Sequence, residues 1–165
     1  MSEFISVDYN QLKCYLECYT GVFLFVKKDG SQRVMLATRN KSTIQSLTGL
    51  ISGGILAGHD KRNSIKTNTI SVIDLVLAEP RAIPVDRLLG VYWFGVLNSQ
   101  NCGPAYDYLN QTTKFIRQQE QEARNRKQQE LLQRLETLSH TGTENLTEEE
   151  RINLESEINE WVAKS

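Results

Sequence analysis

Few of the side chains in this sequence have the types and spacing that catalysis needs. The sequence contains no His-Glu-x-x-His motif, no Cys-x-x-Cys pair and no Gly-x-Ser-x-Gly elbow. Asp74 and Asp86 could form an acid–base pair, but side chains that hydrogen-bond nearby backbone at turns and strand ends are the favoured interpretation. Arg81 beside Asp86 would be a surface ion pair, worth about 0–1 kcal/mol. We therefore predict no catalytic residues, and a protein that is not an enzyme and acts by binding.

The three cysteines, Cys14, Cys18 and Cys102, predict free or structural thiols. An odd number, with no secretory signal segment at the N-terminus, argues against a disulfide framework. Cys14 and Cys18 share one face of a predicted helix, but two thiolates do not complete a metal site, and His59 and His140 are scattered. No apolar run reaches the roughly 18–20 residues of a membrane span. We predict no metal, no cofactor, no membrane contact and a cytoplasmic location.

Cationic side chains in the first part of the chain are the candidates for phosphate binding. Residues 1–104 carry 11 Lys and Arg against 8 Asp and Glu, a balance of +3, whereas residues 105–165 carry 8 against 12, a balance of −4. A balance of +3 permits nucleic-acid binding if the charges cluster on one face, and a normally solvated surface is the alternative. Tyr92 and Trp93 could stack on bases, or belong to the core. The predicted nucleic-acid-binding residues are Lys27, Lys28, Arg33, Arg39, Lys41, Lys61, Arg62 and Lys66.

A β-hairpin over residues 23–39 would position the first of these cations. Asp29-Gly30 between two apolar runs predicts its turn, because glycine adopts a positive φ without a Cβ clash. Several short strands separated by turns favour a small barrel or a strongly bent sheet, since closure removes exposed edges. The other predicted strands cover residues 69–77, 82–85 and 91–97, with a turn at 78–81 and a helical turn or corner at 86–90.

A short helix over Tyr9 to Cys18, capped by Asp8, is predicted before the hairpin. Ser42 could cap a helical turn through Leu47. The glycine-rich stretch 47–68 that follows has two interpretations: a mobile loop whose basic half is merely solvated, or a binding loop that meets phosphate.

After turn-forming residues at 98–104, the sequence predicts one long helix over residues 106–138, polar all round between 117 and 130. A capping box at Thr147 and Glu150 predicts a further helix. The two apolar stripes would fold back as a helical hairpin or pair with another copy of the chain. We expect two domains, residues 1–104 and 105–165. The predicted partner-binding residues are Leu131, Leu135, Leu138, Leu154, Ile158 and Trp161.

Two motif-bearing segments follow each other in a familiar order. The first is the hairpin Lys27-Lys28-Asp29-Gly30-Ser31 with Arg33 and Met35 to Asn40, and the second runs from Ile70 to Leu75 and on through Arg81 to Leu88. This order resembles the small phage domains of the WYL-like, Sm-like SH3 β-barrel group over roughly residues 22–90. The stretch at 47–68 and the helical tail lie outside the resemblance. It implies an SH3/Sm-like barrel, contact with a ligand or nucleic acid through that barrel, a bacteriophage origin and hence the host cytoplasm.

Together these patterns predict an α+β protein: a small SH3/Sm-like β-barrel with a short N-terminal helix and a long C-terminal helical arm or hairpin. The first functional hypothesis is a regulatory or accessory protein that binds DNA or RNA through the basic face of the barrel. The alternative is an adaptor or inhibitor that engages a host protein, or dimerises as a coiled coil, through the acidic helical tail.

Overall fold

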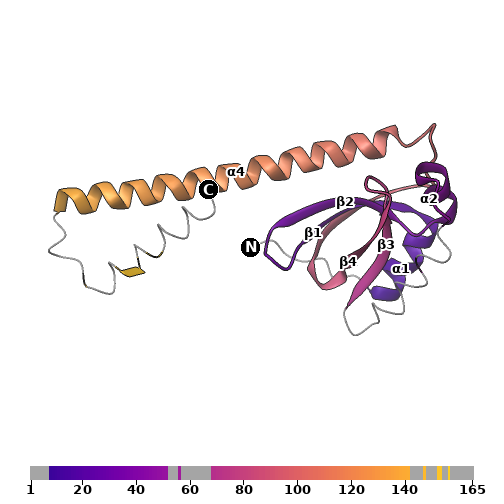
Figure 1. Cartoon of the computed structure of the whole chain (residues 1–165), viewed down its shortest axis with the longest axis horizontal. Coiled ribbons are helices and arrows are strands. Elements are labelled where there is room, and N and C mark those ends of the chain that lie inside the picture. Colours follow the sequence, from indigo (N-terminus) through magenta and orange to yellow (C-terminus); the bar gives the residue numbers. More distant parts are fainter. Residues whose placement is uncertain are drawn as a thin grey trace. The chain divides into compact units, whose positions relative to one another are not determined.

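The computed structural model describes residues 8–51, 56, 68–141, 147, 152–153 and 156. The chain divides into two compact units, Met1–Ile116 and Arg117–Ser165. Its fold is of the α+β class, as predicted, with a five-stranded antiparallel sheet and a long C-terminal helix (Figure 1). Among the described residues, no helix combines the length and the apolar character that a bilayer crossing requires. The predicted division into domains after residue 104 stays a prediction.

Helix α1, Tyr9–Cys18, confirms the helix predicted for these residues. The carboxylate of its N-cap Asp8 accepts a hydrogen bond of 2.8 Å from the Gln11 backbone N–H, which satisfies one free donor of the first turn. Leu12 and Leu16 are four residues apart, so they share one helix face, and both are buried against the sheet.

Strands β1, Thr20–Val26, and β2, Gln32–Thr38, form the predicted hairpin. In its turn the Gly30 N–H donates to the Lys27 carbonyl at 3.1 Å, and the Lys27 N–H donates to the Ser31 carbonyl at 2.8 Å. Gly30 has φ of +84°, the left-handed conformation expected after a type I turn in a three-residue hairpin loop. The Asp-Gly signal therefore located this turn correctly.

The second pair of strands is β3, Thr69–Asp74, and β4, Glu79–Pro84. The turn between them lies at residues 75–78, so the predicted turn at 78–81 was placed three residues too late. The Asp74 carboxylate accepts the Val76 N–H at 3.0 Å and the Leu77 N–H at 3.3 Å, so the chain turns directly after Asp74. Pro80 is accommodated in β4 because this is an edge strand, where a missing N–H breaks no interior ladder.

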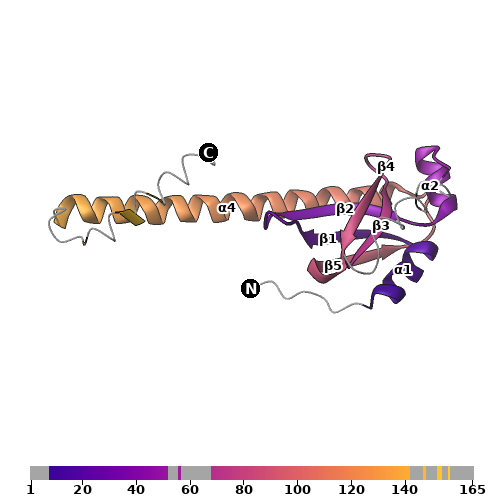
Figure 2. The ribbon, with the colours of Figure 1, turned by 60° about the horizontal axis from the view of Figure 1, so that its bottom comes forward.

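A single 3-10 turn, η2, Val85–Arg87, connects β4 to β5, Leu88–Phe94. The helical turn or corner predicted at 86–90 is thus shorter, and the last strand begins at Leu88 and not at Val91. The strand order is β4-β3-β2-β1-β5, which leaves β4 and β5 as the outer strands (Figure 2). Over the described residues the sheet bends so that β4 approaches β1, but it is not closed.

Both faces of the sheet are covered by apolar side chains. The inner core joins Phe23, Phe25 and Met35 of the hairpin to α1 and to residues of β3, β4 and β5. The outer core lies on the opposite face of the hairpin, around Val22 and Leu36, and joins α2 and the start of α4. The alternation follows from the two-residue period of a strand.

Helix α2, Lys41–Thr48, is capped by Asn40 and not by the predicted Ser42: the Asn40 side-chain oxygen accepts the Thr43 N–H at 3.0 Å. Ile44 of this helix is fully buried in the outer core. Gly49 ends the helix with φ of +71°, a conformation that favours glycine at a helix C-terminus.

Helix α4, Gly103–Thr141, begins three residues before the predicted start at 106. Pro104 is compatible with the first helical turn, where its missing N–H would have no helical partner. Ala105 and Leu109 are buried in the outer core, so the first turns of α4 belong to the first unit.

The remainder of α4 lies in the second unit and is mostly exposed from Arg117 to Glu130, as its polar sequence predicts. Of the predicted partner-binding residues, Leu131 is buried and lies on α4 together with Leu135 and Leu138. The others, Leu154, Ile158 and Trp161, lie outside the described residues, as does Glu150 of the capping box. A helical hairpin or a dimer therefore stays a prediction.

Candidate functional site

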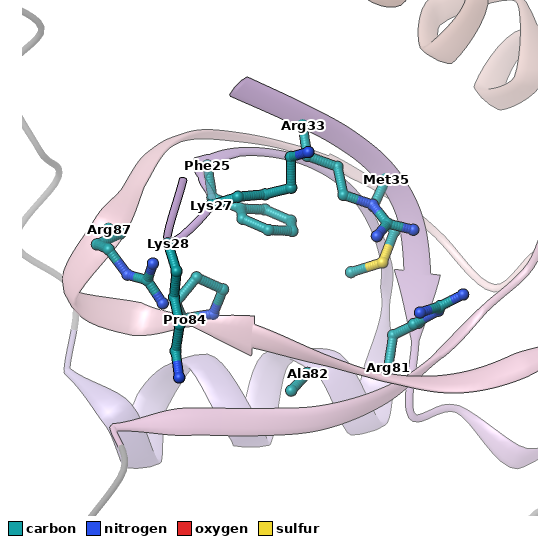
Figure 3. Close-up of a pocket in the computed structure, with 9 residues that line it drawn as sticks. All are labelled: Phe25, Lys27, Lys28, Arg33, Met35, Arg81, Ala82, Pro84 and Arg87. Atoms are coloured by element: carbon teal, nitrogen blue, oxygen red, sulfur yellow. The ribbon is translucent and has the colours of Figure 1, made fainter. Parts of the chain in front are cut away.

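Side chains from β1, β2, β4, η2 and the β1–β2 turn line a pocket with a volume of about 250 Å³. They surround an open centre, toward which Phe25 and Met35 point, with Lys28 and Arg87 on one side of it and Arg33 and Arg81 on the other (Figure 3). We call this the cationic pocket, and it comprises the cations Lys27, Lys28, Arg33, Arg81 and Arg87 and the apolar residues Phe25, Met35, Ala82 and Pro84.

The hairpin positions one side of the pocket by strand periodicity. Phe25 and Lys27 lie on the same face because they are two residues apart, and so do Arg33 and Met35. Phe25 pairs with Arg33 across the two strands, which brings the cations of both strands together. Phe25 and Met35 belong to the inner core, and the cations lie next to them on the side that faces solvent.

The tight turn between the strands holds Lys27 beside the carboxylate of Asp29. Asp29 accepts hydrogen bonds from the Ser31 hydroxyl at 2.6 Å and from the Ser31 N–H at 2.9 Å, and its carboxylate lies 3.3 Å from the Lys27 ammonium. The Ser31 hydrogen bonds, with a smaller contribution from Lys27, lower the pKa of Asp29 to about 2. Asp29 therefore stays ionised and keeps the turn ordered over the whole physiological range.

Arg33 is held in place by a partly buried ion pair. Its Nη2 atom lies 3.4 Å from Oδ2 of Asp74, whose side chain is only 5% exposed. Asp74 thus caps its own turn and pairs with Arg33, in line with the favoured interpretation of this residue as one that hydrogen-bonds nearby backbone. Because the partner carboxylate is buried, Arg33 is the most firmly positioned cation of the pocket.

Strand β4 and η2 supply Arg81 and Arg87, which sequence reasoning did not include among the binding residues. The ion pairs also differ from the expected one between Arg81 and Asp86: Arg81 pairs with Glu79, and Nε of Arg87 lies 4.0 Å from Asp86. These carboxylates are 43% and 55% exposed, and exposed ion pairs contribute little free energy, so both arginines can exchange them for another anion.

All the charged side chains that line the pocket are cationic. None of the described residues that line it is acidic, although four carboxylates pair with its cations from outside. Lys28 is exposed and has no ion-pair partner among the described residues. A concave surface with convergent cations and a low-dielectric apolar wall concentrates anions. The arrangement can bind an anion.

The other predicted cations lie elsewhere. Arg39 is buried, with its guanidinium donating to the Ser71 carbonyl and its Nε 3.7 Å from the Glu17 carboxylate, so it serves the packing of α1 on the sheet. Lys41 is exposed at the start of α2, on the side of the outer core. The loop cations Lys61, Arg62 and Lys66 lie outside the described residues.

The two aromatic candidates have different surroundings. Trp93 packs against the inner core, edge-on to Phe23 with ring centroids 5.5 Å apart, in line with the core alternative. Tyr92 is half exposed and stacks on Tyr108 of α4, with centroids 4.5 Å apart. Neither ring lines the cationic pocket; the aromatic residue that does is Phe25.

Within the described part of the chain, no group of three or more His, Cys, Asp or Glu side chains could hold a metal ion. Cys14 and Cys18 are exposed free thiols on α1, and Cys102 is half-buried.

No family model, curated protein or solved structure matches this chain. The resemblance to the phage domains therefore stays a prediction.

Proposed function

We propose that this protein acts by binding a nucleic acid, DNA or RNA, through the cationic pocket, as a regulatory or accessory protein and not as an enzyme. The observation that carries the proposal is the convergence of five cations on one concave surface with no acidic lining residue among those described. Nucleic-acid affinity rests largely on Lys and Arg that neutralise phosphates, and such cations need to be clustered to act together.

The architecture supports a further part of this proposal, that the first unit is an SH3/Sm-like barrel. The five strands form an antiparallel sheet in which β5 returns to the side of β1, and one 3-10 turn joins the two outer strands. The bend that brings β4 toward β1 is the one a small barrel requires. A bacteriophage origin and action in the host cytoplasm belong to the same proposal and rest on the sequence resemblance.

The proposal predicts that reversing two exposed cations of the pocket weakens binding strongly. Lys28→Glu combined with Arg81→Glu changes the local charge by four units without removing a buried group. We expect at least a tenfold loss of affinity for mixed-sequence DNA oligonucleotides at low salt, measured by fluorescence anisotropy. Lys41→Glu combined with Lys114→Glu is the matched control: it makes the same four-unit change at two exposed lysines that do not line the pocket, and it should change affinity less than threefold.

Equal losses in the two double variants would show that binding depends on net charge and not on the pocket. No binding by the unmodified protein at low salt would refute the nucleic-acid proposal.

The second candidate function, an adaptor that engages a protein partner through the helical tail, has one observation in its favour. Helix α4 continues past the turns that the first unit buries, and its stretch from Arg117 to Glu130, in the second unit, is mostly exposed. A helix that is polar all round is commonly one that bridges to another structure. A partner that is lost when residues 117–165 are removed would support this function.

A further inference from the structure

We propose that Cys14 and Cys18 of α1 form a two-thiolate site that binds one Cu(I) ion, a soft monovalent cation, at the surface of the first unit. The inference is independent of the cationic pocket and of the proposed nucleic-acid binding. It depends on three observations: both thiols are exposed, they lie one helical turn apart, and the turn that joins them is fixed by hydrogen bonds to the rest of the unit.

The exposure of both cysteines is unusual for this type of residue. Free cysteine is among the side chains most often buried, because its thiol behaves as a small and weakly polar group. Cys14 and Cys18 are both exposed, whereas Leu12 and Leu16 of the same helix are buried in the inner core. Neither thiol belongs to that core, so both can meet a ligand that arrives from solvent.

The spacing of the two cysteines places their thiols next to each other. Residues four apart in a helix are neighbours on one face, with Cβ atoms about 5–6 Å apart. Because Cα–Cβ bonds tilt toward the N-terminus of a helix, the side chain of Cys18 lies over the turn that carries Cys14. Two sulfur atoms on such a pair can hold one ion between them.

Hydrogen bonds from the segment between β2 and α2 fix the turn that joins the two cysteines. The Leu16 carbonyl accepts the Arg39 backbone N–H at 2.9 Å, and the Glu17 carbonyl accepts the Asn40 side-chain amide at 3.0 Å. Both carbonyls belong to the last turn of α1. This turn therefore cannot unwind without breaking hydrogen bonds to the sheet end and to α2.

The fixed turn opposes a disulfide between the two thiols. A disulfide needs Cβ atoms about 3.5–4.5 Å apart, closer than the roughly 5–6 Å of an intact helical turn. Closing that distance would distort the turn that carries the buried Leu16. Cys14 and Cys18 are thus held as two separate thiols, which is the form that a metal ion requires.

The number of ligands selects the ion. Zinc takes four ligands in a closed site, and no described group of three or more His, Cys, Asp or Glu side chains approaches that set. Cu(I) prefers soft thiolate ligands, and two of them in a linear arrangement satisfy it. Each thiol releases its proton when it binds the ion, no electron is transferred, and the bound unit carries one negative charge at an exposed surface.

The test titrates Cu(I) into the reduced full chain without oxygen, in competition with the chelator bicinchoninate. We expect one ion per chain. Cys14→Ser and Cys18→Ser should each lower the affinity at least about a hundredfold, because a single thiol loses the advantage of two linked ligands. Cys102→Ser is the matched control: this half-buried thiol lies outside α1, and its loss should change affinity less than twofold.

A displaced pair tests the spacing itself. Asn10 is exposed and lies one turn before Cys14, so Asn10→Cys combined with Cys18→Ser restores two exposed thiols four residues apart. This variant should recover the affinity of the unmodified protein to within about tenfold. Circular dichroism and thermal unfolding of each variant establish that α1 and the sheet remain folded.

Three results would overturn the site. The first is an affinity that neither single cysteine substitution changes. The second is an affinity that Cys102→Ser lowers as much as Cys14→Ser does. The third is one ion per two chains, with a Cu(I)-dependent dimer in size-exclusion chromatography, because the ion would then join two molecules and not two turns of one helix.

Discussion

At the scale of single residues, the conformation of the β1–β2 turn determines where the pocket lysines lie. Gly30 adopts φ of +84°, and a Cβ added there would meet no atom within 4 Å. The requirement for glycine is therefore one of backbone conformation and not of space. Asp29 completes the turn, with its pKa lowered to about 2 by the hydrogen bonds from Ser31.

Gly30→Ala should lower the free energy of unfolding by about 1 kcal/mol, because a side chain makes a positive φ unfavourable. The matched control is Gly95→Ala: this glycine is also free of close neighbours but has no positive φ, so the change should be neutral or slightly stabilising. Urea denaturation measures both. Equal effects at the two positions would contradict the conformational explanation.

The partly buried hydroxyl of Tyr106 shows how the start of α4 is attached to the sheet. It donates a hydrogen bond of 3.3 Å to the Leu75 carbonyl, at the turn after β3. Burial, together with Cys102 and Asp74 nearby, raises the pKa of Tyr106 above the ordinary tyrosine value of 10.0. Since the neutral form is the one that packs here, this contribution to stability is complete below pH 10 and is lost as the pH rises through the raised pKa.

At the scale of elements, α4 is one continuous helix that serves two units. Its first turns are part of the first unit through Ala105 and Leu109, whereas its later turns are not. The composition of the sequence changes at residue 105, but the packing changes after Ile116. A boundary drawn from composition alone would therefore cut through the outer core.

Two truncations test this difference. A chain ending at Ile116 should remain folded and keep its nucleic-acid affinity. A chain ending at Pro104 loses the buried side chains of Ala105 and Leu109, which should cost at least about 2–5 kcal/mol and leave little of the marginal stability of a domain. Circular dichroism and thermal unfolding distinguish the two. If both truncations were equally stable, the first turns of α4 would not belong to the first unit.

The sequence predicted elements well where local chemistry determines them. Asp8 and Asp29-Gly30 located α1 and the first hairpin, because capping and turn preferences act over a few residues. Predictions were wrong at β4, where Pro80 suggested a turn. The turn is set instead by the Asp74 carboxylate, and an edge strand tolerates the proline.

The candidate site was predictable only in part. Lys27 and Arg33 could be placed on one face of the hairpin, beside Phe25 and Met35, from the two-residue period alone. Arg81 and Arg87 reach the same pocket because the sheet bends β4 toward β1, and no local pattern encodes that approach. Arg39 is the opposite case: its charge suggested a binding residue at the surface, but in the fold it is buried and lies beside Glu17 of α1.

At the scale of the whole molecule, the distribution of charge separates the two functional candidates. Residues 1–104 have a balance of +3, from 11 cations against 8 anions, and residues 105–165 one of −4, from 8 against 12. The modest positive balance becomes significant because five of those cations line one pocket. The proposed nucleic-acid binding would thus be a property of the first unit, and a protein partner would be a property of the tail.

The most direct measurement of the central claim is the salt dependence of affinity for a single-stranded oligonucleotide. Each phosphate neutralised releases bound counterions, so the slope of log K against log salt concentration should be about −1.4 to −3.5 for two to five phosphate contacts. The charge-reversal variant, Lys28→Glu with Arg81→Glu, should flatten that slope by more than 1, and Lys41→Glu with Lys114→Glu should leave it unchanged. A flat slope for the unmodified protein, or the same slope in all three proteins, would contradict a phosphate-binding pocket.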